Sequence, residues 1–224
     1  MISTVIFDMD GVIVDTEPIH HAAFKEHFKL LNITVSESLY ATFTGNSTKN
    51  VYQKIKDRFN LQDQIVDLVD AKRIIFNDLF DKNTNITLLN GVEDLIKNLH
   101  KNGMQLILAS SSANVTINKI FKKFDLDQYF AFKISGEDFE FSKPNPAIFN
   151  HAVRISEHKT ENCIVIEDST NGIKAAKSAG IFCIGYDSIN SKLQDYSQAD
   201  LVISNFNEID YLSVIHLNSI KNGL

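Results

Sequence analysis

The sequence predicts an α/β protein, a Rossmann-like doubly wound parallel sheet with a small all-helical cap domain inserted after the first strand. Short apolar runs of strand length recur along the chain, and from about residue 87 onward they alternate with helical patterns. Between residues 16 and 86 the pattern is helical nearly throughout and contains no convincing strand. We therefore expect a core domain formed by residues 1–15 and 87–224 and a cap domain formed by residues 16–86.

The predicted strands are nearly continuous apolar runs, which are typical of strands buried on both faces of a parallel sheet. They lie at residues 5–7, 104–109, 163–166, 181–184 and 201–203. The helices expected between them cover residues 91–99, 147–153 and 172–179, and those expected in the cap cover residues 19–31, 48–59 and 64–80. Asn102-Gly103 and Gly180 are helix C-terminal signals, and Pro146 suits a first helical turn.

Composition places the chain among ordinary globular proteins and excludes several functional classes. Hydrophobic residues make up 44% of the chain, and 28 Asp and Glu outnumber 22 Lys and Arg, for a net charge of −6. The sequence has no basic stripe, so no nucleic-acid partner is expected. A membrane span needs roughly 20 apolar residues and a signal peptide needs a basic start, and neither pattern is found. Cys163 and Cys183 lie in apolar runs and are expected to be buried free thiols, which favours a cytoplasmic location.

Two carboxylates follow the first predicted strand, in the order Asp8-Met9-Asp10-Gly11. Residues two apart in an extended chain point to the same side, so both carboxylates can face one site. In an open α/β sheet, ligands bind just beyond the carboxyl ends of the strands. Adjacent carboxylates repel each other unless a cation neutralises them, and Mg²⁺ suits that role. The alternative is an ordinary turn at Asp10-Gly11, with Asp8 capping a loop or helix.

Hydroxyl groups follow the strand at residues 104–109. Ser110, Ser111 and Ser112 precede a helix that is expected to begin at Val115. Because the N-terminus of a helix presents free backbone N–H groups, small polar residues there are typical of a phosphate site. The alternative is that one of these serines is an ordinary N-cap.

Two later segments contribute a lysine and another pair of acids. Lys143 lies on a stiff turn, Ser142-Lys143-Pro144-Asn145-Pro146, and its alternative role is that of a solvated surface lysine. Glu167 and Asp168 end the strand at residues 163–166, where the alternative is an N-cap role for Asp168 or Ser169. Together with Asp8 and the serines, these groups predict a metal-plus-phosphate site with one acid free to act as a nucleophile.

Taken in order, these motifs resemble the four signatures of the haloacid dehalogenase superfamily. Residues 7–17, Phe-Asp-Met-Asp-Gly-Val-Ile-Val-Asp-Thr-Glu, are similar to the first signature. Ser110, Lys143-Pro144 and Glu167-Asp168-Ser169 are similar to the second, third and fourth. The resemblance spans nearly the whole chain, includes a helical cap after the first strand, and looks closest to the beta-phosphoglucomutase-like branch of phosphatases and phosphohexomutases.

The resemblance implies a role for each matching residue. Asp8 would be the nucleophile that forms an aspartyl-phosphate, and Asp10 would be the general acid and then the general base. Ser110, Ser111 and Lys143 would bind the phosphoryl oxygens. The Mg²⁺ ligands that it implies are the Asp8 carboxylate, the Asp10 main-chain carbonyl, Asp168 and, as a further candidate, Glu167.

The cap is expected to select the substrate, because the core handles only the phosphate. The polar candidates that face the core are Thr16, Glu17, His20 and the turn Thr44-Gly45-Asn46-Ser47-Thr48-Lys49. His20 also fits a structural role in the first turn of a helix.

The cap departs from the mutase pattern at two positions. In phosphohexomutases a cap arginine follows the Gly-x-Ser turn and binds a second phosphate, whereas this chain has Thr48 there. A mutase lysine on the last cap helix aligns with Ile74, although Lys72 and Arg73 are adjacent in sequence. Without these cations a bisphosphate intermediate would be held poorly, so hydrolysis is favoured.

We therefore expect an Mg²⁺-dependent phosphatase that acts on a small phosphorylated metabolite such as a sugar phosphate. The alternative is a phosphohexomutase that uses the same intermediate. A non-catalytic ligand-binding protein of this fold is less favoured, because every catalytic position is filled. The sequence leaves the substrate and the oligomeric state open, and a monomer is compatible with it.

Overall fold

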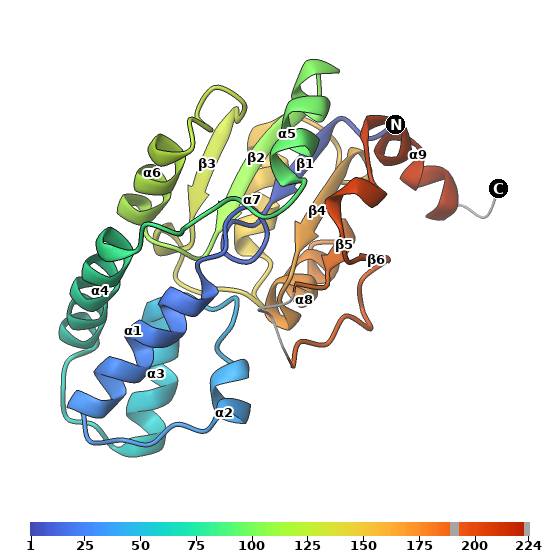
Figure 1. Ribbon diagram of the computed structural model, residues 1–224. Coiled ribbons are helices and arrows are strands. Elements are labelled where there is room, and N and C mark those ends of the chain that lie inside the picture. The colour runs from blue at the N-terminus through green and yellow to red at the C-terminus, as the bar shows by residue number, and fades with distance from the viewer. Residues whose placement is uncertain (189–192, 222–224) are drawn as a thin grey trace.

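The computed structural model describes residues 1–188 and 193–221. A six-stranded sheet in the order β3-β2-β1-β4-β5-β6 forms its centre, and every neighbouring pair of strands is parallel. The expected doubly wound α/β fold is therefore confirmed (Figure 1). The strands are β1 (Thr4–Phe7), β2 (Gln105–Ser110), β3 (Phe132–Ser135), β4 (Cys163–Glu167), β5 (Phe182–Tyr186) and β6 (Leu201–Ile203).

The helices connect the strands or form the segment between β1 and β2. They are α1 (Glu17–Leu30), α2 (Glu37–Ala41), α3 (Thr48–Phe59), α4 (Ile65–Lys82), α5 (Val92–Lys101), α6 (Asn114–Lys123), α7 (Ala147–Ser156), α8 (Thr170–Ser178) and α9 (Tyr211–Lys221). Short 3-10 turns lie at Gly136–Asp138, Thr160–Asn162 and Phe206–Glu208. Within residues 1–188 and 193–221, no helix combines the length and the apolar character that crossing a membrane requires.

Side-chain alternation along β1 divides the core into two layers. Val5 and Phe7 pack in one apolar cluster with residues of α5, α6 and α9. Ile6 points to the other face and packs with residues of α7 and α8. Both faces of the sheet are thus covered, which explains why the strands are apolar runs rather than alternating ones. Cys163 and Cys183 are buried free thiols, as expected.

The position of β1 decides where the site forms. Phe7, at the end of β1, pairs with Leu108 of β2 on one side and with Ile166 of β4 on the other. Because all three strands are parallel, the residues that follow them meet at one edge of the sheet. The chain leaves β1 toward β2 on one side of the sheet and reaches β4 on the other, so this edge is a topological switch point, where α/β proteins bind ligands.

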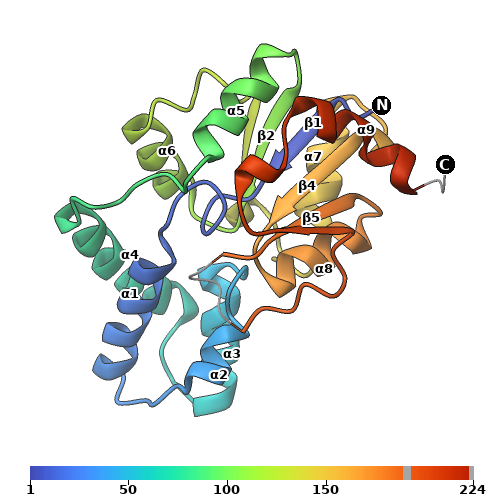
Figure 2. The same cartoon turned by 45° about the vertical axis from the view of Figure 1, so that its right-hand side comes forward.

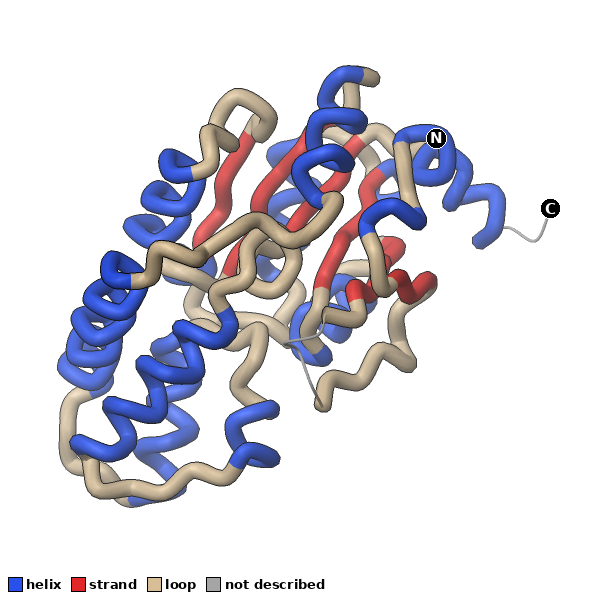
Figure 3. The backbone as a smooth tube through the Cα atoms, viewed as in Figure 1, coloured by secondary structure: helices blue, strands red, loops and turns tan. Residues whose placement is uncertain are grey.

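Helices α1–α4 lie together beyond the carboxyl ends of the strands (Figure 2). The segment that holds them, residues 17–82, contains no strand (Figure 3). They share an apolar cluster of their own, made of Phe24, Phe28, Phe43, Val51, Tyr52, Ile55 and Leu68. The two connections to the sheet run side by side, since Val14 bridges Leu88 and the Asp15 N–H donates to the Thr87 carbonyl at 3.4 Å. The division of the chain into a cap of residues 16–86 and a core stays a prediction.

The sequence pattern missed one strand, β3, and two helices, α2 and α9, and displaced several other boundaries by one to three residues. Strand β3 was missed because Phe132 and Lys133 are exposed at the edge of the sheet, so no continuous apolar run marks it. Helix α2 has five residues, too few to display a helical period. Helix α6 begins at Asn114 rather than Val115.

Candidate active site

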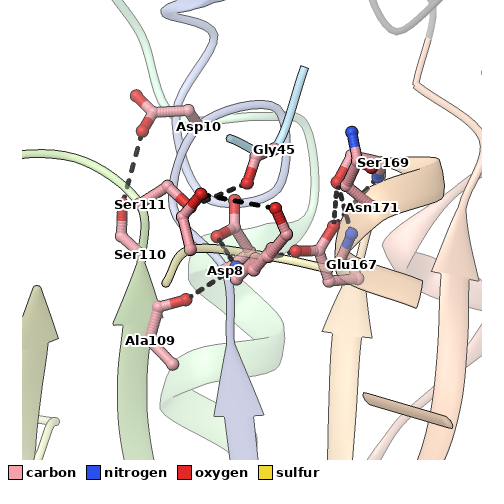
Figure 4. Close-up of polar contacts among 12 residues, drawn as sticks. Asp8, Asp10, Gly45, Ala109, Ser110, Ser111, Glu167, Ser169 and Asn171 are labelled. Atoms are coloured by element: carbon pink, nitrogen blue, oxygen red, sulfur yellow. Dashed lines mark hydrogen bonds and ion pairs between the residues drawn. The ribbon is translucent and has the colours of Figure 1, made fainter. Parts of the chain in front are cut away.

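A buried lysine connects the ends of β1, β2 and β4. Lys143 lies in the loop before α7 and is 1% exposed, so the alternative of a solvated surface lysine is wrong. Its Nζ donates to Asp8 Oδ1 at 2.6 Å, to Glu167 Oε1 at 2.8 Å and to the Ala109 carbonyl at 3.0 Å. Figure 4 shows Asp8 and Glu167 turned toward the same space above Ala109.

The lysine and the two carboxylates determine each other's charge. Burial raises the pKa of Asp8 to about 8, the repulsion of Glu167 and Asp10 adds to that effect, and Lys143 opposes it. Burial alone would lower the pKa of Lys143, but the attraction of Asp8 and Glu167 outweighs burial and raises it. Lys143 is therefore a permanent cation that offsets only part of the negative charge around it.

Three buried acids form a group that fits a divalent cation. Oxygens of Asp8, Glu167 and Asp168 lie within 4.8 Å of one another. Oε2 of Glu167 also accepts hydrogen bonds from the N–H and the hydroxyl of Ser169, both at 2.9 Å. Gly11, at φ +81°, approaches so closely that a Cβ there would lie 2.1 Å from Asp168 Oδ2. One lysine cannot neutralise three buried acids, and carboxylate oxygens are the ligands that hard divalent cations prefer.

Asp10 lies outside this acid group, in a separate set of hydrogen bonds. Its carboxylate accepts from the hydroxyls of Thr16 and of Ser112, the latter at 2.7 Å. It also accepts from the Ser110 hydroxyl at 3.4 Å (Figure 4). His20 Nε2 lies 3.4 Å from Asp10 Oδ1. Burial alone would raise the pKa of Asp10, but His20 and the hydroxyls of Thr16 and Ser112 lower it to about 2. Asp10 is therefore held as a carboxylate, and it is turned away from the group of acids formed by Asp8, Glu167 and Asp168.

The serines after β2 do not cap α6. The N-cap position is Ala113, so the serine-cap alternative is wrong. Ser110 is fully buried, and its Oγ accepts from the Ser112 N–H at 3.0 Å. Ser111 donates to the Gly45 carbonyl at 2.8 Å. By contrast Ser169 does cap α8, since its Oγ accepts from the Gly172 N–H at 3.0 Å, and that alternative holds.

A cavity of about 470 Å³ opens over these residues, between the sheet and α1–α4. From the core, Asp8, Asp10, Asp168, Ser111 and Ser112 reach it. From the cap, it is lined by Glu17, His20, Tyr40, Phe43, Thr48, Lys49, Lys72 and Arg73. Of the expected cap candidates, Thr16 is not on its wall but buried behind it, where it bonds to Asp10.

Ile74, which aligns with the mutase lysine, does not line the cavity. Ile74 is 70% exposed, whereas Lys72 is 2% exposed and its Nζ lies 2.8 Å from His20 Nδ1. Phe76 stacks on the His20 ring with centroids 4.3 Å apart. Burial lowers the pKa of Lys72 to about 7 and also lowers that of His20.

A sequence signal for Lys72 was present. The buried residues of α4 are Leu68, Lys72, Phe76 and Phe80, which recur every fourth residue along one face of the helix. Because lysine is almost never fully buried unless it is paired, a lysine within an apolar stripe indicates a buried charge that has a partner. Tyr40, Phe43 and Glu137 also line the cavity, and the sequence analysis did not single them out.

Replacing Lys143 by methionine should destabilise the metal-free protein by about 3–5 kcal/mol, because two buried carboxylates lose their cation. The loss should be larger above pH 8 than below it. With Lys143 present the pKa of Asp8 is about 8, so below that pH folded Asp8 is protonated and needs no cation, whereas above it Asp8 is charged and has lost its partner in the variant. Urea unfolding of Lys143→Met at several pH values measures this. The control is Lys174→Met, which removes an exposed lysine from α8. A loss no greater than in the control would contradict the structural role of Lys143.

Comparison with known proteins identifies the fold as that of one family. A model of the haloacid dehalogenase-like hydrolases matches residues 5–186. A phosphorylated carbohydrates phosphatase of Thermotoga maritima is 27% identical over 181 residues, which cover 79% of this chain and 81% of the relative. A crystal structure of beta-phosphoglucomutase from Clostridium difficile is 25% identical, with a TM-score of 0.87 and 99% of both chains covered.

A variant of CbbY from Rhodobacter sphaeroides, solved in complex with xylulose-(1,5)bisphosphate, is also similar. It is 27% identical, with a TM-score of 0.80, and the alignment covers 93% of this chain and 96% of that one. The order of the four motifs, the parallel sheet and the family match agree. This chain belongs to the haloacid dehalogenase-like hydrolases, in the branch that resembles beta-phosphoglucomutase.

Proposed function

We propose that this chain is an Mg²⁺-dependent phosphatase that hydrolyses a small phosphorylated sugar through an aspartyl-phosphate intermediate. The observation that carries the proposal is the buried cluster of Asp8, Lys143, Glu167 and Asp168, of which Asp8 and Asp168 line the cavity. A carboxylate beside a fixed cation and a divalent-metal site is suited to attack a phosphate. The proposal draws further support from relatives named as phosphatases of phosphorylated carbohydrates.

Asp8 is the nucleophile in this proposal. Its carboxylate attacks phosphorus, and the bond from phosphorus to the ester oxygen breaks. Lys143 keeps Asp8 oriented through the 2.6 Å contact. Without substrate, Ser110 donates to Asp10 and Ser111 donates to the Gly45 carbonyl; in this proposal both hydroxyls and Lys143 turn hydrogen-bond donors to the phosphoryl oxygens when substrate binds. Donors of this kind stabilise the charge that develops in the transition state.

Asp10 transfers the protons. It gives a proton to the leaving alkoxide, then takes one from the water that attacks the aspartyl-phosphate and releases Asp8 and inorganic phosphate. The lowered pKa of Asp10 suits the second role. For the first role, the negative charge of a bound phosphate ester would raise that pKa and favour the protonated form.

The metal site consists of Asp8, Asp168 and the Asp10 main-chain carbonyl, with Glu167 as a further candidate. Glu167 is engaged by Lys143 and Ser169, so in this proposal it contributes charge and orients its neighbours. When bound, Mg²⁺ supplies positive charge to the transferring phosphoryl group. The cytoplasmic location also stays a prediction.

A phosphohexomutase is the second candidate function, and Lys72 is the observation that favours it. A mutase must hold a second anionic group away from Asp8, and Lys49, Lys72 and Arg73 all line the cap side of the cavity. However, Arg73 is paired with Glu137, and burial lowers the pKa of Lys72 to about 7, so both offer reduced positive charge. We therefore keep hydrolysis as the first candidate.

Phosphate release from a panel of sugar phosphates and other phosphoesters tests the proposal. We expect release with Mg²⁺, none with EDTA, and none from Asp8→Asn, which has the shape of the wild-type side chain without its nucleophilic charge. A second arm supplies beta-glucose 1-phosphate with a bisphosphate primer. Formation of glucose 6-phosphate faster than phosphate release would establish the mutase instead, and turnover by Asp8→Asn would exclude the covalent route.

Glu17 should control the pH dependence of substrate binding. Burial raises the pKa of Glu17 to about 8, with Asp10 and Asp8 adding to the effect and Lys72 opposing it. Glu17 is thus neutral at pH 7 and gains a negative charge above pH 8, inside the cavity that receives an anionic substrate. The repulsion between this negative charge and the anionic substrate should raise KM by about tenfold.

KM measured from pH 6.5 to 9.5 at saturating Mg²⁺ checks this expectation. In Glu17→Gln the rise centred near pH 8 should disappear, and the smaller rise near pH 7 from loss of the Lys72 proton should remain. Glu26→Gln, on the exposed face of the same helix, is the matched control. Identical KM profiles for Glu17→Gln and wild type would contradict this role for Glu17.

A further inference from the structure

A loop of the cap rests directly on the first turn of α8. The segment of residues 41–45 begins at Ala41, the last residue of α2, and forms most of the connection to α3; its residues Phe43, Thr44 and Gly45 line the cavity. The side-chain amide of Asn171 donates to the Thr44 carbonyl at 2.7 Å and to the Thr42 carbonyl at 3.2 Å. One core side chain thus holds two carbonyls of the cap loop.

Two more core side chains hold the same loop. Ser111 donates to the Gly45 carbonyl at 2.8 Å (Figure 4). Gln194 donates to the Ala41 carbonyl at 3.1 Å, while its Oε1 accepts from the Thr170 N–H at 2.9 Å. Of the five carbonyls of residues 41–45, four therefore accept hydrogen bonds from the core. We call Asn171, Gln194 and Ser111 with this loop the cap latch.

Close packing at Gly45 is a second, independent observation that the loop is in direct contact with the core. Gly45 has φ +78°, and a Cβ there would lie 2.2 Å from Ser169 Oγ. Ser169 cannot move aside freely, because its hydroxyl donates to Glu167 and accepts from the Gly172 N–H. The turn that orients Glu167 is therefore also the surface on which the cap loop sits.

Asn171 itself is not on the wall of the cavity. It lies two residues after Ser169, where α8 begins, and it reaches residues that are more than 120 positions away in sequence. Its amide supplies both hydrogen atoms of one NH₂ group to carbonyls that only the cap provides. When the cap moves away, the Thr44 carbonyl loses this partner and the Thr42 carbonyl keeps only the Asn46 side-chain amide of the cap itself, at 3.3 Å, so the contacts with Asn171 exist only with the cap closed.

We propose that Asn171 is a positioning residue that holds the cap closed over the catalytic cluster. Through the Thr42 and Thr44 carbonyls it fixes the loop that carries Gly45 and leads into α3, and so completes the cavity wall. The latch couples cap closure to the same α8 turn that orients the acids after β4. This inference concerns cap movement and holds for either reaction under Proposed function.

The sharpest variant is Asn171→Asp, which keeps the size of the side chain but replaces the donor with an acceptor. A carboxylate facing two carbonyls is repelled, and two hydrogen bonds are lost. We expect the closed-to-open ratio to fall by about tenfold. Asn171→Leu removes the donors without adding charge and should shift the ratio in the same direction. Asn150→Asp, which adds the same charge on the exposed face of α7, is the control.

Cap position can be measured without substrate by spectroscopic labels at Arg58→Cys on α3 and Lys174→Cys on α8. Both positions are exposed, whereas Cys163 and Cys183 are buried and should escape labelling. We expect longer label distances to gain population in Asn171→Asp and Asn171→Leu, and no change in Asn150→Asp. Gly45→Ala, which would push the loop off Ser169, should lengthen the distances too.

Kinetics supply the second readout, on whichever phosphoester proves to be turned over. Weaker closure should raise KM by about tenfold in Asn171→Leu while kcat stays within about twofold, because bound substrate still favours the closed cap. A purely structural role would lower thermal stability and leave both KM and the label distances unchanged, and that result would overturn the proposal. If no phosphoester is hydrolysed, the proposed function fails, but the distance measurement still decides on the latch.

Discussion

The contact of Lys143 with Asp8 and Glu167 is the constraint on which the rest of the site depends. A lysine that is 1% exposed can stay charged only if acids surround it, and acids this deeply buried can stay charged only if a cation is near. Burying any one of these charged groups without the others would cost free energy. The contact joins the ends of β1 and β4 to the loop before α7, so the parallel sheet and the catalytic cluster depend on each other.

The same edge of the sheet also determines where the cap can sit. Ser169 caps α8, orients Glu167 and leaves room only for glycine at position 45. On the other side, Thr16 and His20, at the start of α1, contact Asp10. The two carboxylates after β1 therefore face different partners: Asp8 faces the lysine and the acids, and Asp10 faces the cap. That division is consistent with separate roles in attack and in proton transfer.

The meeting of these residues could be predicted from the sequence, because parallel strands bring their carboxyl ends to one edge of the sheet. This rule predicted that Asp8, Ser110 and Glu167 would meet, and the structure brings them to that edge. The expectation that Asp8 and Asp10 point to the same side assumed an extended chain, but β1 ends at Phe7, so the separate hydrogen bonds of Asp10 were not foreseen. In the cap, Lys72 was not recognised as a buried residue, although it belongs to the apolar stripe of α4. Asn171 could not be connected to residues 41–45, since its donors pair with main-chain carbonyls, which carry no sequence signal.

The central claim is that Asp8 carries the phosphoryl group, and chemical trapping tests it most directly. The protein is mixed with its best phosphoester and Mg²⁺, quenched with acid during turnover, digested and analysed by mass spectrometry. The account predicts one added phosphoryl group on the peptide that contains Asp8, absent in Asp8→Asn and sensitive to hydroxylamine as acyl phosphates are. Turnover without any such adduct in the wild type or in Asp10→Asn, or an adduct on another residue, would contradict it.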